Sequence, residues 1–156
     1  MKLLELKQQY EKLAKSYKLS SFDELNVDFE IEKLQDKETD FLLRNIRRCM
    51  FERVTAILRF LEILVNPTES PPIYVFSVIK SISPETKKII DRTYKELISL
   101  ELGSLDLDID YNEKNEAKFI KEFSESWKTT KKDLKEITKK LGVVWGHEKM
   151  HDNYFG

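Results

Sequence analysis

Cysteine is almost absent from this sequence, with Cys49 as the only one among 156 residues. A disulfide framework is therefore excluded, and a reducing compartment fits the composition. The N-terminal stretch also lacks the uninterrupted apolar block of a signal peptide, so we expect a cytoplasmic protein. We expect Cys49 itself to act as a small apolar residue in the core.

Glycine and proline are scarce, with four of each, and neither sign of charge is in excess, since the net charge is −1. A near-neutral chain has no global field that would attract nucleic acid or an anionic membrane. The sequence contains no glycine-rich phosphate loop and no G-x-S-x-G nucleophile motif. We therefore expect neither catalysis nor a cofactor. Charged residues make up 35 % of the chain, which resembles the composition of thermophile proteins.

The longest apolar-periodic run covers residues 40–66, and it predicts a long central helix. Its apolar residues recur at steps of three and four, which places them on one helix face: Leu43, Ile46, Met50, Val54, Ile57, Leu61 and Leu64. A helix with so broad an apolar face belongs in the middle of a core. Five arginines interrupt the run, which excludes a membrane span.

Four further helices are expected around it, over residues 2–18, 73–82, 84–102 and 112–141. Ser83-Pro84-Glu85 is a helix start signal, and Asn112 is a suitable cap for the last helix. Gly103 and Gly142 are expected to end the two helices that precede them. The prediction is a mainly α protein, a single-domain helical bundle over residues 1–142. Residues 143–156, with Trp145, Tyr154 and Phe155, are predicted to form a C-terminal docking tail.

Two segments, 27–32 and 105–111, alternate strictly between apolar and acidic residues, which is typical of strands. They offer a small two-stranded β ribbon as an addition to the bundle. One face of the ribbon would then be acidic: Asp28, Glu30, Glu32, Asp106, Asp108 and Asp110. Like charges opposite each other destabilise a ribbon, so a basic neighbour or a cation should cover this face.

Five of the six arginines lie in the central run, which has no lysine: Arg44, Arg47, Arg48, Arg53 and Arg59. The flat guanidinium group suits half-buried ion pairs and phosphates. We favour internal pairing, for example Arg48 with Glu52 and Arg59 with Glu62. Residues 20–40 hold eight acids and two lysines, which also favours internal complementarity. The alternative is contact with an anion or a nucleic acid.

The segment His147-Glu148-Lys149-Met150-His151 matches the HExxH pattern of zinc peptidases. Two histidines at i,i+4 share a helix face and can hold Zn²⁺, while the glutamate serves as general base. Only five residues follow, without a separate third ligand, so metal binding by His147 and His151 is favoured over peptidase activity.

A lysine-rich segment precedes this motif, with Lys128, Lys131, Lys132, Lys135, Lys139 and Lys140. Lysines in such a row can contact phosphates. Because Trp127 is the only nearby aromatic residue and has core spacing, we interpret the row as a solvated helix face. Nucleic-acid binding stays the second interpretation.

Three stretches together, FLLRNIRRCMFERVTAILRFLEILVNP, SPETKKIIDRTYKEL and LDIDYNEKNEAKFIKEF, resemble a set of small helical proteins of archaea and some bacteria that have no assigned activity. This resemblance implies a helical fold over most of the chain. An arginine-bearing helix followed by a capped SPE-type helix is also similar to the helical domain of archaeal GINS replication subunits. That resemblance implies a replication or repair accessory role, but this sequence has no counterpart of their small β domain.

The sequence therefore predicts a non-enzymatic interaction or scaffold protein that self-associates, as a homodimer, or that binds another protein, without a membrane. The density of apolar helix faces and the aromatic tail motivate this prediction. The alternatives are a nucleic-acid-associated factor and, more remotely, an HExxH metallopeptidase.

Overall fold

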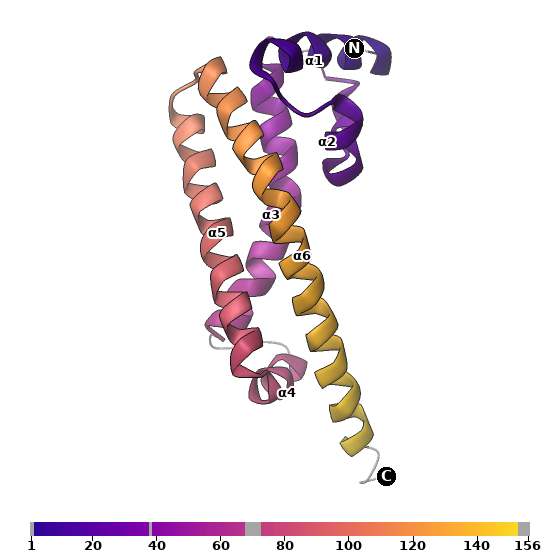
Figure 1. The fold of residues 1–156 in the computed structure, drawn as a ribbon, viewed down its shortest axis with the longest axis vertical. Coiled ribbons are helices and arrows are strands. Elements are labelled where there is room, and N and C mark those ends of the chain that lie inside the picture. The colour runs from indigo at the N-terminus through magenta and orange to yellow at the C-terminus, as the bar shows by residue number, and fades with distance from the viewer. Residues whose placement is uncertain (1, 38, 68–72, 153–156) are drawn as a thin grey trace. The chain divides into compact units, whose positions relative to one another are not determined.

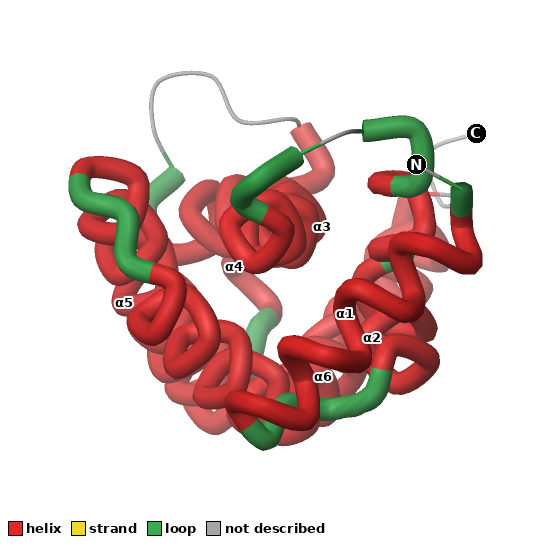
Figure 2. The backbone as a smooth tube through the Cα atoms, turned by 90° about the horizontal axis from the view of Figure 1, so that it is seen from above, coloured by secondary structure: helices red, strands yellow, loops and turns green. Residues whose placement is uncertain are grey.

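The computed structural model describes residues 2–37, 39–67 and 73–152, with side chains as far as His147. Its elements are α1 (Leu3–Tyr17), α2 (Phe22–Phe29), the 3₁₀ turn η1 (Ile31–Leu34), α3 (Leu42–Val65), α4 (Ile73–Ser81), α5 (Pro84–Ile109) and α6 (Glu113–Asp152). The described ranges contain no strand, as the absence of yellow in Figure 2 shows. The prediction of a mainly α helical bundle is confirmed.

The chain divides into two compact units, and α3, α5 and α6 each contribute to both. The first unit consists of Met1–Ala56 and Ser99–Trp127, and the second of Ile57–Ile98 and Lys128–Gly156. Among the described residues, no helix is both long enough and apolar enough to cross a membrane.

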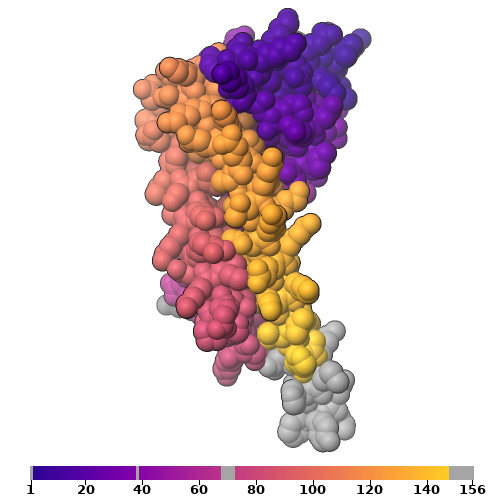
Figure 3. All heavy atoms as spheres, in the orientation of Figure 1, coloured from indigo at the N-terminus to yellow at the C-terminus, as the bar shows by residue number. Residues whose placement is uncertain are grey.

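The core of the first unit is rich in aromatic residues. Phe29, at the end of α2, packs against Phe123 and Trp127 of α6, with ring centroids 5.4 and 5.3 Å away. Tyr10 of α1 is fully buried, and its hydroxyl donates a hydrogen bond to the carbonyl of Ser20 at 2.7 Å. This bond satisfies the polar end of a buried ring. The atoms of α1 and α2 consequently form one closely packed surface (indigo in Figure 3).

The second unit is built from the end of α3, α4, the start of α5 and the end of α6 (Figure 1). Its core is aliphatic and includes Leu61, Val78, Ile90, Leu97 and Ile137. One ion pair links two of its helices, since Arg92 of α5 donates to Asp133 of α6 at 2.6 Å.

The predicted helix starts are confirmed, and side-chain caps explain them. The hydroxyl of Ser83 accepts from the N–H of Thr86 at 3.2 Å, and the Asn112 side chain accepts from the N–H of Asn115 at 3.0 Å. Ser21 and Glu24 form a reciprocal capping box at the start of α2. Such caps satisfy N–H groups that have no partner within the helix.

The predicted ribbon is wrong, because both of its segments are helical. Residues 105–109 complete α5, whose last turns carry carbonyls without helical partners. Arg44 donates to one of these, the carbonyl of Leu107, at 2.9 Å. One turn earlier, Arg47 donates to the carbonyl of Ser104 at 3.1 Å. Residues 27–29 belong to α2, where burial of Phe29 among aromatic rings decides the conformation. Tertiary contacts thus override the alternating pattern.

The two glycines expected to end helices lie inside them instead. A Cβ atom on Gly103 would lie 3.1 Å from Cε2 of Phe119, so glycine here allows α5 and α6 to approach closely. At Gly142 a Cβ would meet nothing within 4 Å, and α6 continues to Asp152. The predicted boundary at residue 142 is therefore not a helix end. Tyr154 and Phe155 of the predicted docking tail lie outside the described residues.

Candidate functional site

Arg47 is the centre of a buried charge cluster in the first unit. Its side chain is 0 % exposed. Its Nε donates to Glu116 at 2.6 Å and its Nη2 to Asp108 at 2.7 Å, while Nη1 donates to the carbonyl and hydroxyl of Ser104. Since Glu116 is also 0 % exposed, a cation from α3 and an anion from α6 compensate each other away from water.

Arg44 extends this cluster toward solvent. It lies 3.4 Å from Glu116, and its guanidinium carbon is 4.7 Å from the ring centroid of Tyr111 and 5.9 Å from that of Phe41. A flat, weakly hydrated guanidinium stacks well on aromatic faces. Arg44 therefore interacts with a backbone carbonyl, a carboxylate and two aromatic rings at the same time.

The other three arginines of the row also face carboxylates. Arg48 pairs with Asp108 at 2.9 Å, Arg53 with Glu30 at 3.0 Å, and, in the second unit, Arg59 with Glu62 at 2.9 Å. The expectation of internal pairing is confirmed for all five arginines, although Arg48 does not use Glu52, which binds Lys33. An anion or nucleic acid at this row stays a prediction, and it would have to displace these carboxylates.

The cluster shifts the pKa values of its members in the directions that stabilise charge. Burial alone would raise the pKa of Asp108, but hydrogen bonds from Arg47 and Arg48 outweigh it and lower that pKa below its ordinary value. Burial likewise opposes the charge on Arg47, yet hydrogen bonds to Glu116 and Asp108 raise its pKa. Both groups therefore stay ionised at neutral pH.

The six acidic residues of the expected ribbon do not share one strand face. Glu30 binds Arg53 and Asp108 binds two arginines, as expected if basic groups cover the acids. Glu32 instead accepts from the uncharged amide of Asn26. Asp28 lies half-buried on α2. Asp106 and Asp110, near the end of α5, are exposed. The acidic surface postulated for a cation is thus dispersed.

The HExxH prediction falls largely outside the described residues. The side chain of His147 is exposed on α6, whereas the side chains of Glu148 and His151 lie beyond the described part. Among the described residues, no group of three or more His, Cys, Asp or Glu side chains is placed to hold a metal ion. Zinc at His147 and His151 stays a prediction.

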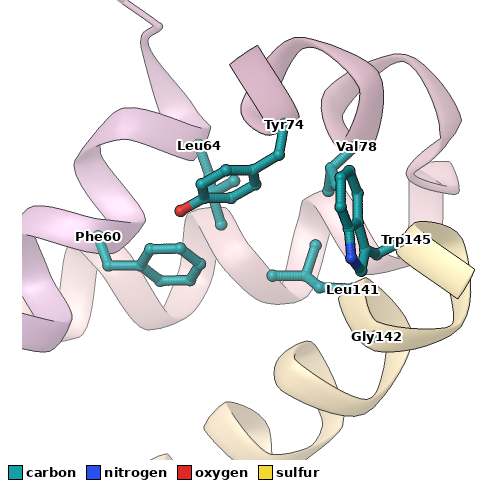
Figure 4. Close-up of a pocket in the computed structure, with 7 residues that line it drawn as sticks. All are labelled: Phe60, Leu64, Tyr74, Val78, Leu141, Gly142 and Trp145. Atoms are coloured by element: carbon teal, nitrogen blue, oxygen red, sulfur yellow. The ribbon is translucent and has the colours of Figure 1, made fainter. Parts of the chain in front are cut away.

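The second unit contains a cavity of about 400 Å³ that sequence reasoning missed. Three helices line it: Phe60 and Leu64 from α3, Tyr74 and Val78 from α4, and Leu141, Gly142 and Trp145 from α6 (Figure 4). Tyr74 and Trp145 meet edge to face across it, with centroids 6.1 Å apart. The volume falls in the range of about 300–1,000 Å³ that is usual for ligand pockets. We call it the apolar cavity.

The helices that form the apolar cavity also carry exposed apolar side chains that do not line it. Ile73 and Phe76 of α4 are 89 % and 51 % exposed, and Val143 of α6 is 54 % exposed. A second cavity of about 340 Å³ shares Leu64 and has Lys87 and Asp91 among its lining residues.

The two units carry opposite net charges, although the whole chain is nearly neutral. The first unit holds 14 Lys and Arg against 19 Asp and Glu, a balance of −5, and the second holds 13 against 9, a balance of +4. The lysines of α6 account for much of the positive charge. Lys128, Lys132, Lys135 and Lys139 are all exposed and fall on one helix face.

The apolar cavity was difficult to predict because its lining residues have ordinary core spacing. Leu64 and Leu141 read as positions of buried helix faces, and Tyr74 lies in a short apolar run without clear periodicity. The aromatic character of residues 143–156 was the one useful signal, since Trp145 lines the cavity.

Comparison with known proteins gives no match: no family model, no curated protein and no solved structure is significantly similar to this chain. The fold defines an all-helical class, and any function has to be argued from the surfaces described above.

Proposed function

We propose that the protein is a non-enzymatic interaction or scaffold protein that associates with a second copy of itself, with the apolar cavity of the second unit as a contact surface. The observation that carries this proposal is the apolar cavity. Its lining is almost entirely apolar, and the same helices carry further exposed apolar side chains at Ile73, Phe76 and Val143. Removing such surface from water is favourable, at about 25 cal/mol per Å², and association is the way to remove it.

The arginine row supports the same proposal indirectly. Guanidinium groups that bind phosphate need free donors, but Arg47 uses its donors on Glu116, Asp108 and Ser104. Four of the five arginines belong to the first unit, whose net charge is negative. The cluster therefore has the chemistry of a structural link between α3, α5 and α6.

Light scattering over a concentration series tests the proposal. We expect a mass above 18.5 kDa that increases with concentration. Tyr74→Glu, which places a charge at the apolar cavity, should shift the equilibrium to the monomer. Val27→Glu is the matched control, because Val27 is 78 % exposed on α2 of the first unit. A strictly monomeric wild-type protein at all concentrations would contradict self-association.

Nucleic-acid binding is a second candidate function, which the charge of the second unit favours. Four exposed lysines on one face of α6 span about 16 Å at 1.5 Å per residue, a length suited to several backbone phosphates. Fluorescence anisotropy with labelled single- and double-stranded DNA and RNA at low ionic strength tests it. Lys128→Glu with Lys132→Glu should weaken any binding, and no binding in low salt would eliminate this candidate.

A further inference from the structure

The end of α5 presents an apolar stripe that no described residue covers. Leu102, Leu105 and Ile109 are 63 %, 54 % and 86 % exposed, and they follow one another at i, i+3 and i+7. This spacing puts them on one helix face. Single exposed leucines are ordinary, but three in register on two turns form a surface that favours a partner.

Two carboxylates border this stripe. Asp106 and Asp110 are exposed, and in the described part of the chain neither takes part in an ion pair. Asp108, which lies between them in sequence, is held by Arg47 and Arg48. The stripe therefore has the pattern of an amphipathic helix with exposed apolar side chains and acidic neighbours. Helices with this pattern bind in apolar grooves of partner proteins.

The apolar cavity of the second unit has the complementary chemistry. Lys135 and Lys139 precede Gly142 by seven and three residues on α6, so they share the helix face on which Gly142 borders the cavity (Figure 4). Both lysines are exposed, and among the described residues neither forms an ion pair. An apolar cavity beside a helix face that carries lysines suits an apolar helix with acidic flanks.

We propose that the stripe of one copy, Leu102, Leu105 and Ile109, occupies the apolar cavity of a second copy, with Asp106 and Asp110 facing Lys135 and Lys139. This inference rests on the proposed self-association and specifies its two surfaces. The opposite charges of the two units, −5 and +4, favour such an encounter between copies. Each contact joins two different surfaces, the stripe of one copy and the cavity of the other.

A complementation experiment tests the pairing. The stripe variant carries Leu105→Lys and Ile109→Lys, and the cavity variant carries Trp145→Glu. Each variant alone should be monomeric by light scattering. An equimolar mixture should form a dimer of about twice 18.5 kDa, because one variant retains the cavity and the other retains the stripe. Circular dichroism checks that both are folded, and Val27→Lys is a control that should associate like wild type.

Charge exchange provides a second test that uses only exposed positions. Lys135→Glu with Lys139→Glu should weaken association by about tenfold, the value for two charge pairs at an interface rim. A mixture with the chain that carries Asp106→Lys and Asp110→Lys should restore it. Added salt should weaken the wild-type contact.

The outcomes separate this inference from the proposed function. A wild-type chain that is monomeric throughout overturns both. A stripe variant that associates like wild type, or a mixture of the two variants that stays monomeric, overturns the pairing while self-association stands. Association of two cavity variants with each other would likewise show that a different surface is used.

Discussion

Replacing Arg47 by methionine tests the idea that the buried cluster holds the first unit together. Methionine keeps an unbranched side chain as far as the position of Nε and removes the charge and the donors. Glu116, 0 % exposed, is then left with Arg44 at 3.4 Å as its remaining ion-pair partner in the described part of the chain. Breaking a buried pair from one side costs about 3–5 kcal/mol, since the other charge stays desolvated.

The expected loss is a large fraction of the total free energy of unfolding of a domain, which is about 5–15 kcal/mol. With an m-value of about 2 kcal/mol/M, urea denaturation followed by circular dichroism should show a midpoint about 2 M lower. Arg48→Met is the matched control. Arg48 is 52 % exposed and its pair with Asp108 is a surface pair, so its loss should cost less than about 1 kcal/mol.

A second substitution separates charge compensation from packing. Arg47→Met combined with Glu116→Leu removes both buried charges, and we expect it to recover most of the lost stability, because apolar replacements of buried pairs are often neutral. The reasoning would be refuted if Arg47→Met destabilised no more than Arg48→Met. It would also be refuted if the double variant were less stable than Arg47→Met, since the buried carboxylate that has lost Arg47 would then not be the cause.

Three further predictions follow from single contacts. Because the pKa of Asp108 lies below its ordinary value of 3.8, its contribution to stability is present above that pH and is lost as the pH falls through the lower, folded-state pKa. Asp108→Asn should therefore reduce the difference in urea midpoint between about pH 7 and pH 2, whereas Asp106→Asn should leave that difference unchanged. Gly142→Ala should raise the free energy of unfolding by about 0.5–1 kcal/mol, since the added Cβ meets open space. Gly103→Ala should show no such gain, because the added Cβ lies 3.1 Å from the ring of Phe119. Thermal melts compare the two variants, and equal gains would contradict the packing role of Gly103. Ser83→Ala removes the cap of α5 and should cost about 1 kcal/mol in the same melts, and an unchanged melting temperature would count against the cap.

The sequence by itself determined the helical class, the central helix and the helix starts, because these depend on local chemistry. Steps of three and four residues define the buried face of α3, which runs over Leu42–Val65 as expected from residues 40–66. Ser83 and Asn112 supply caps within three residues of the N–H groups they satisfy. The burial of Cys49 also follows from its position on that face.

Only the tertiary structure decided the partners of the arginines, the fate of residues 105–109 and the apolar cavity. Asp108 lies 60 residues from Arg48, so no local pattern could select it over the predicted Glu52. Glu116 likewise lies 69 residues from Arg47. Arg44 also donates to the carbonyl of Leu107 near the end of α5, where the alternating segment is helical. The cavity arises because α3, α4 and α6 meet at Leu64, Tyr74 and Trp145, and the space between three packed helices is a property of their arrangement that no one helix encodes.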